Sequence, residues 1–143
     1  MPPILRRPWL PTAELFEIDL SDPFDLRTVA ALQLEGSYLS ARQVGHTVRL
    51  AVSTGPQELP WVYPGSGPGE DLARETNRTV IERSTYADWT PSYRLTTDDG
   101  ASSGDLLRCD RINHPADFSG FDVVSVIDID LDDLRLDARG LSR

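Results

Sequence analysis

The chain has 143 residues with 23 acidic and 14 basic side chains, a formal net charge of −9, and this length suits one compact domain with a substantial core. A strongly negative chain repels phosphate backbones and anionic bilayers, so the charge disfavours binding to nucleic acid or to a membrane surface. The single Cys109 excludes an intramolecular disulfide, no apolar run approaches the length of a membrane span, and residues 1–12 contain no apolar signal-peptide core.

The first half of the chain predicts short antiparallel strands. In Ala13–Leu20 the side chains of Leu15, Glu17 and Asp19 alternate with those of Phe16, Ile18 and Leu20, the period of a half-buried strand. Three further alternating runs follow, around Leu32 and Leu34, over Tyr38–Val44, and over Val48, Leu50 and Val52. Their connections are too short for parallel crossovers, which favours antiparallel neighbours.

A loop and a helix interrupt this strand pattern. The Pro- and Gly-rich stretch from Pro56 to Gly69 predicts a loop, with Trp61 and Tyr63 as anchors. Leu72, Thr76, Val80 and Ser84 then recur at four-residue steps, which predicts a helix within about residues 69–88. Pro91 ends any helix before it.

The second half predicts a hairpin, a loop and one strong strand. Tyr93–Leu95 and Leu106–Cys109 are expected to pair as strands around a turn at residues 98–104. Residues 113–120 form a turn-rich loop, and Val123–Leu131 is the most β-branched segment of the chain. Residues 132–143 are charged and are expected to be a frayed tail.

Three segments carry a resemblance to a known family: LEGSYLSARQVGHTVRLAV, NRTVIERSTYADWTPSYRL and GDLLRCDRINHPADFSGFDVVSVIDIDL. In this order they resemble segments of bacterial secreted proteins containing a C-terminal β-propeller domain. The resemblance implies an all-β, mainly antiparallel fold with one helical insertion, a partial β-propeller of about two blades. It divides the chain into an N-terminal extension (residues 1–12), the partial propeller (13–131) and a C-terminal tail (132–143). Within the propeller, residues 30–35 would form the outer strand of one blade, residues 38–44 the inner strand of the next, and residues 54–92 an insertion.

The resemblance also predicts an incomplete ring. Its members begin with a secretion or lipoprotein signal and run several hundred residues, so this chain looks like a fragment. Propeller rings close with about four to eight blades of four strands each, more than 143 residues supply. We therefore expect open sheet edges through which the isolated chain associates with itself.

Candidate metal sites have simpler explanations. The run Asp128, Asp130, Asp132 and Asp133 offers carboxylates to calcium, but it lacks the Gly and Glu of a calcium loop, and an exposed strand face explains the alternation. Cys109, His114 and His46 are too few for a structural zinc site. No metal and no cofactor is therefore expected.

Other motifs also favour a protein without a catalytic site. Ser66 lies in a flexible Gly-Pro loop and not in a nucleophile elbow, and the Gly-rich stretch lacks the spacing of a phosphate loop. The sequon at Asn77 falls in the predicted helix and is given no weight. Five aromatic residues either pin the insertion to the sheet or form a ligand platform: Trp61, Tyr63, Tyr86, Trp89 and Tyr93.

These observations favour a non-catalytic propeller segment of a secreted or envelope-associated protein, with a binding or scaffolding role toward an unknown protein or glycan partner. By the resemblance, we expect an extracellular or cell-envelope location, although this chain shows no signal peptide. The alternative is a propeller enzyme whose active site is completed by missing blades, to which Asp110 or Asp117 would contribute acidic groups.

Overall fold

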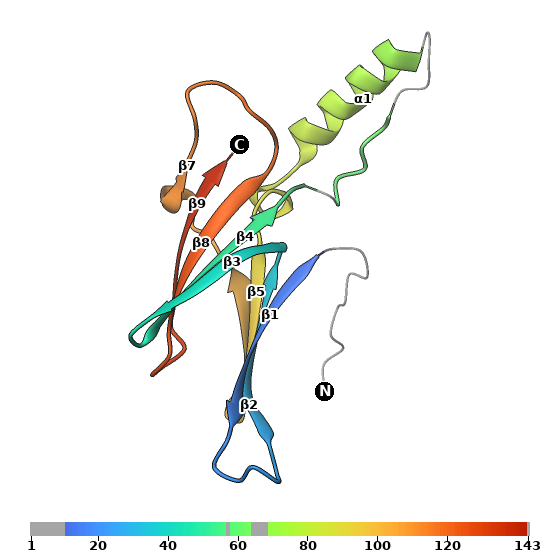
Figure 1. Cartoon of the computed structure of the whole chain (residues 1–143). Coiled ribbons are helices and arrows are strands. Elements are labelled where there is room, and N and C mark those ends of the chain that lie inside the picture. The colour runs from blue at the N-terminus through green and yellow to red at the C-terminus, as the bar shows by residue number, and fades with distance from the viewer. Residues whose placement is uncertain (1–10, 57, 64–68, 143) are drawn as a thin grey trace.

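The structure, a computed structural model, describes residues 11–56, 58–63 and 69–142 and contains two β-sheets with one helix extending from their end (Figure 1). Sheet A has the strand order β1-β2-β5-β6, and sheet B has the order β3-β4-β8-β9-β7. The strands are β1 (Thr12–Asp19), β2 (Arg27–Glu35), β3 (Ser37–Val44), β4 (Thr47–Thr54), β5 (Ser92–Thr97), β6 (Gly100–Asp105), β7 (Ile112–Asn113), β8 (Val123–Asp130) and β9 (Leu136–Ser142). The helices are α1 (Gly69–Arg83) and the short 3-10 helices η1 (Tyr86–Asp88) and η2 (Cys109–Arg111).

Successive hairpins alternate between the two sheets. The β1-β2 and β5-β6 hairpins form sheet A, whereas β3-β4 and the β8-β9 pair lie in sheet B, where β9 also pairs with β7 in parallel. The central pairings, β2 with β5 and β4 with β8, join segments far apart in the sequence and are antiparallel. Each sheet is therefore completed only after the insertion between β4 and β5 has been traversed.

The inner faces of the two sheets form one core, which the alternation in the sequence explains. In β2 the side chains of Ala30, Leu32 and Leu34 are buried while their neighbours are less so, and in β8 Ile127 and Ile129 are fully buried. The core cluster contains apolar residues of both sheets, and their removal from water is the main stabilising contribution. Its buried members are Ala13, Leu32, Leu34, Leu50, Val52, Leu106, Leu107, Val123, Ile127, Ile129 and Ala138.

The chain crosses from sheet A to sheet B at Gly36. Its φ is +127°, a conformation that side chains rarely adopt, and a Cβ there would lie 2.6 Å from Thr54 Oγ1 and 2.9 Å from the Ser53 carbonyl oxygen. The Gly36 N–H donates to the Pro11 carbonyl at 2.7 Å. Only glycine meets both the conformation and the close approach, so this residue lets consecutive strands enter different sheets.

The predicted helix is confirmed. Helix α1 spans Gly69–Arg83, with Glu70 and Asp71 in its first turn and Arg83 in its last, charges that suit the helix dipole. Among its residues Ala73 is buried. The helix and η1 lie within the insertion expected at about residues 69–88.

The second strand of the β5-β6 hairpin lies earlier in the chain than its sequence predicts. It was expected at Leu106–Cys109, but β6 spans Gly100–Asp105, and Cys109 begins η2. The residues of β6 are small and exposed, and they lack the alternating pattern of a strand. They form a strand because they pair with β5, from Ser92↔Asp105 to Thr97↔Gly100. Leu106 and Leu107 remain buried, but they follow the strand.

The prediction of a frayed tail over residues 132–143 is wrong for most of that segment. Residues Leu136–Ser142 form β9, which pairs with β8 along its length from Ile129↔Leu136 to Val123↔Ser142. Ala138 and Gly140 are buried there, and a Cβ at Gly140 would meet Leu107 Cδ1 at 2.8 Å. The strand is therefore packed into the core despite its charged sequence.

Two finer expectations about faces and edges also change. The side chains of Phe16 and Ile18 were assigned to one face of a half-buried strand, but they are 52% and 48% exposed, and the residues of β1 that contact the core are Ala13 and Leu15. Residues 30–35 were expected as an outer strand, yet β2 lies between β1 and β5. Residues 38–44, expected as the inner strand of the next blade, lie in β3 at one edge of sheet B.

The expected fold class is confirmed. The described part of the chain is mostly antiparallel sheet with one α-helix, and its two sheets, neither closed on itself, agree with a partial propeller of about two blades. Residues 1–10 of the expected N-terminal extension lie outside the described residues.

Candidate functional site: an aromatic cluster beside the helical insertion

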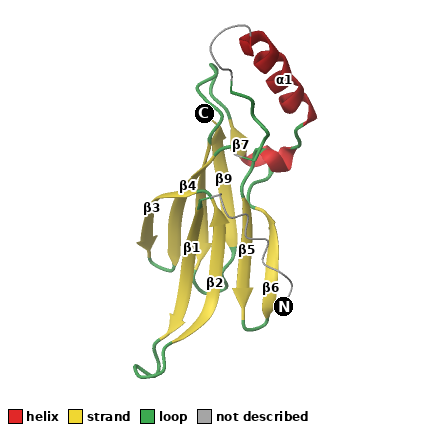
Figure 2. Cartoon of the chain, turned by 90° about the vertical axis from the view of Figure 1, so that its right-hand side faces the viewer, coloured by secondary structure: helices red, strands yellow, loops and turns green. Residues whose placement is uncertain are grey.

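The insertion between β4 and β5 forms the end of the molecule at which α1 projects (Figures 1 and 2). A side chain of α1 holds the loop that precedes it: Asn77 Nδ2 donates to the Val62 carbonyl at 2.9 Å, and the Val62 N–H donates to Asn77 Oδ1 at 2.8 Å. The side-chain amide of Asn77 thus pairs with both backbone groups of Val62, as a neighbouring strand would. It fixes the loop at Val62 against the helix.

Four aromatic rings meet where this insertion approaches the loop before β8. Phe121 lies at the centre, with ring centroids 5.8 Å from Trp61, 5.9 Å from Trp89 and 5.0 Å from Phe118. Trp61 and Trp89 also contact edge to face, with centroids 6.4 Å apart. We call these four residues the aromatic cluster. Such pairs stabilise beyond their buried area, so the cluster joins three separate loops into one surface.

The two indoles are anchored, whereas the two phenyl rings face water. Trp61 Nε1 donates to the Pro56 carbonyl at 3.0 Å, and Trp89 Nε1 donates to Ser84 Oγ at 2.7 Å. Phe118 is 76% exposed and Phe121 is 48% exposed. The cluster therefore has a fixed polar side toward the insertion and an apolar, solvent-exposed side.

A cavity of about 530 Å³ lies next to the cluster, between α1 and the loop at Leu59 and Pro60. Ser84, which accepts the Trp89 indole hydrogen bond, lines it. The cavity wall combines apolar, hydroxyl and charged side chains: Leu59, Pro60, Glu75, Thr76, Thr79, Val80, Arg83, Ser84 and Asp88. Asp88 also closes η1, where its carboxylate accepts from the Thr85 N–H at 2.7 Å.

The five predicted aromatic residues do not form a single group. Trp61 and Trp89 belong to the cluster. Tyr93 packs against the core, the Tyr86 hydroxyl donates to the Leu107 carbonyl at 2.8 Å, and Tyr63 is 84% exposed. Trp61 and Trp89 are thus brought together in one cluster, and Tyr86 attaches η1 to the segment that follows β6.

Phe118 and Phe121 were not among the predicted aromatic residues. They lie in a loop some thirty residues beyond Trp89, and only the fold brings that loop to the insertion. The available signal was two phenylalanines in a turn-rich loop directly before the strongest strand, where apolar rings need a partner to avoid water.

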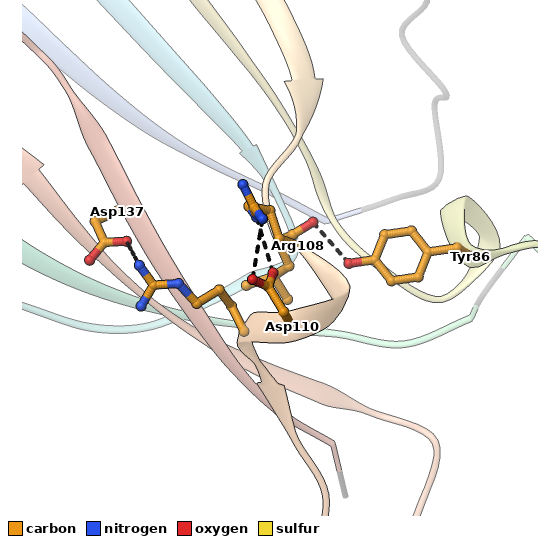
Figure 3. A network of polar contacts seen from close by, with 6 residues as sticks. Tyr86, Arg108, Asp110 and Asp137 are labelled. Carbon is orange, nitrogen blue, oxygen red and sulfur yellow. Dashed lines mark hydrogen bonds and ion pairs between the residues drawn. The ribbon is translucent and has the colours of Figure 1, made fainter.

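Asp110, proposed for the alternative enzyme, belongs to a network of surface ion pairs (Figure 3). Arg108 Nε donates to Asp110 Oδ1 at 3.0 Å, and this hydrogen bond lowers the pKa of Asp110 below its ordinary value. Nearby, Arg111 contacts Asp137 at 3.4 Å. Burial raises the pKa of the Tyr86 phenol. Asp117, the second acid proposed for that enzyme, is exposed.

The residues considered as metal ligands have other contacts. Asp128 and Asp130, on the outer face of β8, pair with Arg49 at 2.6 Å and with Arg135 at 3.7 Å, and Asp132 approaches His46 at 3.2 Å. Cys109 is exposed in η2. Among the residues that the structure describes, no three potential ligands gather as a metal site would require.

The comparisons with known proteins gave one result. A protein-family model with the description "Beta propeller domain" matches residues 6–140. No curated protein and no solved structure matches the chain significantly. Within the described ranges, no helix is both long and apolar enough to cross a bilayer.

Proposed function

The chain belongs to the beta propeller domain family, and from this premise we propose that it is a non-catalytic segment that binds a ligand for a secreted or envelope-associated protein. The aromatic cluster is the observation that carries this proposal. Three loops converge on it, its indoles are held by hydrogen bonds, and two of its rings face solvent. Exposed apolar surface that is gathered in one place and bordered by polar residues is typical of a site of interaction.

A glycan is the partner that this surface fits best. The apolar faces of sugar rings stack on aromatic rings, and their hydroxyl groups need carboxylate and hydroxyl partners beside the stack. Phe118 and Phe121 supply the rings, and the cavity on the Trp89 side of the cluster supplies the carboxylate of Glu75 and the hydroxyls of Thr76 and Thr79. A preformed pocket with a few polar groups is the usual form of such a site.

The absence of catalysis is part of the proposal, and the state of Asp110 supports it. Its hydrogen bond with Arg108 favours the ionised carboxylate, whereas a general acid needs a raised pKa near the working pH. The location outside the cytoplasm is likewise proposed, from the resemblance of the three segments quoted above. Fractionation of the producing cells, with an antibody against the chain, tests that location.

Binding to cell-surface polysaccharides tests the proposed function directly. We expect the full chain to bind at least one glycan in calorimetric titration, and Phe118→Ala to weaken binding at least about tenfold because it removes an exposed stacking surface. Tyr63→Ala is the matched control, since Tyr63 is similarly exposed, at 84%, but lies outside the cluster. Equal loss of affinity in the two variants, or turnover of a bound glycan, would refute the proposal.

A further inference from the structure

The β1-β2 hairpin extends beyond the rest of sheet A. The last β2-β5 pair is Ala30↔Thr97, so residues 27–29 and the β1 residues opposite them lack a third strand. Figures 1 and 2 both show this end of the hairpin projecting past the neighbouring strands. We call residues 16–27 the hairpin arm. It exposes five large apolar side chains, each about half exposed or more: Phe16, Ile18, Leu20, Phe24 and Leu26.

The hairpin arm is also acidic. It carries Glu17, Asp19, Asp22 and Asp25 against the single Arg27, which pairs with Asp25. Asp19 and Asp22 accept hydrogen bonds from backbone N–H groups of the turn and remain exposed. An arm with this many apolar side chains and a net negative charge suits an apolar, basic partner surface.

Such a surface exists on the same chain, at the edge of sheet B. All eight residues of β3 are exposed, including Tyr38 at 59%, Leu39 at 51% and Val44 at 68%. The β3-β4 hairpin, residues 37–54, contains Arg42 and Arg49 and no acidic residue, which is unusual in a chain of net charge −9. Arg49 pairs with Asp128, whereas Arg42 makes no ion pair with any described residue.

We propose that the hairpin arm of one copy docks on the β3 edge of a second copy. Opposite charge and exposed apolar side chains match on the two surfaces, and each lies on an edge strand with backbone groups open to pairing. In both views the tip of the arm lies apart from the β3-β4 turn of its own chain (Figures 1 and 2), so the contact is between molecules.

Because the two surfaces differ, each copy can bind one neighbour through its hairpin arm and a second neighbour through its β3 edge. A contact of this type repeats head to tail and gives a closed ring or an open chain of copies. Each copy supplies two sheets, and propeller rings contain about four to eight. A ring of about two to four copies would therefore contain as many sheets as a propeller ring has blades.

The proposal is tested by reversing one charge on each surface and measuring self-association by sedimentation equilibrium. We expect the full chain to associate in a concentration-dependent way, and Arg42→Glu and Glu17→Arg each to weaken association at least about tenfold. Mixing the two variants restores association, because the altered β3 edge of one now matches the altered arm of the other. Arg78→Glu, at an exposed position of α1, makes the same charge change and leaves the mass distribution of the parent chain unchanged.

Two further measurements distinguish a variant that fails to fold from one that folds but has lost the contact between copies. Circular dichroism must show native strand content in each variant, and Phe24→Ser, at a turn residue 97% exposed, should also weaken association without altering the fold. A monomer at all concentrations, undiminished association of Arg42→Glu, or failure of the mixture to associate would each overturn the proposal. Phe118→Ala is expected to associate normally, so failure here is distinct from failure of the proposed glycan site.

Discussion

At the scale of single residues, buried polar groups show where the core departs from simple apolar packing. Thr54 is 8% exposed, and its hydroxyl donates to the Glu35 carbonyl at 3.0 Å, which ties β4 to the strand crossing at Gly36. Ser125 is fully buried in β8, and among the described residues its hydroxyl has no hydrogen-bond partner. A buried group without a partner costs free energy, whereas a paired one contributes a little.

Ser125→Ala is therefore expected to raise the free energy of unfolding by about 1 kcal/mol, because it removes a desolvated hydroxyl. Thr54→Val is the matched control, for which the change in unfolding free energy has the opposite sign. It removes a made hydrogen bond and should lower the free energy of unfolding by about 1 kcal/mol. Urea denaturation followed by circular dichroism measures both, and a stability loss in Ser125→Ala would show that the hydroxyl is satisfied in solution.

The Arg49–Asp128 pair predicts how stability responds to acid. The hydrogen bond from Arg49, with the charge of that guanidinium, lowers the pKa of Asp128 in the folded chain. A carboxyl whose folded pKa is depressed contributes stability above its unfolded pKa, and this contribution is lost as the pH falls through the folded value. We expect the unfolding free energy to fall below about pH 4, and to fall less steeply in Asp128→Asn.

Asp99→Asn, in the exposed β5-β6 turn, is the control for this acid dependence. It removes one carboxylate without breaking an ion pair, since no described cation contacts Asp99. Parallel stability curves for Asp128→Asn and the unaltered chain would contradict the prediction.

At the scale of elements, local sequence identified strands whose side chains alternate strongly and missed those that depend on a partner. Val123–Asp130 was found because its β-branched residues alternate between core and solvent. Gly100–Asp105 has the composition of a turn, and it becomes a strand because β5 pairs with it along its whole length. Likewise, β9 forms a strand because it pairs with β8. This is a tertiary contact, so the composition of the segment does not predict it.

The same limit applies to the candidate site. Trp61 and Trp89 were identified because they flank a predicted helix, and aromatic residues in such positions often anchor it. Phe118 and Phe121 could not be joined to them from the sequence, because the contact between the loop before β8 and the insertion depends on the tertiary arrangement of both sheets. The helix itself was identified in advance by its four-residue repeat.

The helix is expected to depend on one side chain for its attachment to the preceding loop. Asn77→Ala removes both hydrogen bonds to Val62, so amide hydrogen exchange at Val62 should accelerate at least about tenfold while exchange in β8 is unchanged. Arg78→Ala, at the adjacent exposed position, is the control and should leave both rates as they are. Unchanged exchange at Val62 in Asn77→Ala would mean that the loop is held by other contacts.

At the scale of the whole molecule, the order of strands in the sheets was the property least accessible to sequence. Short connections predicted that neighbouring strands pair, and this holds within each hairpin but not between hairpins. Gly36 sends the chain into the other sheet, and the pairing of β2 with β5 spans the entire insertion. Each sheet therefore combines strands from both halves of the chain, and the two sheets share one core.

This arrangement predicts that the two sheets unfold together. Leu34 of β2 and Ile127 of β8 are fully buried in the common core, so Leu34→Ala and Ile127→Ala should each lower the unfolding free energy by about 2–5 kcal/mol. Each variant should keep a single transition that coincides in tryptophan fluorescence and in circular dichroism. Independent sheets would instead give two transitions, with only the transition of the substituted sheet shifted. Coincidence of the probes in both variants thus separates one shared core from two blades that merely lie side by side.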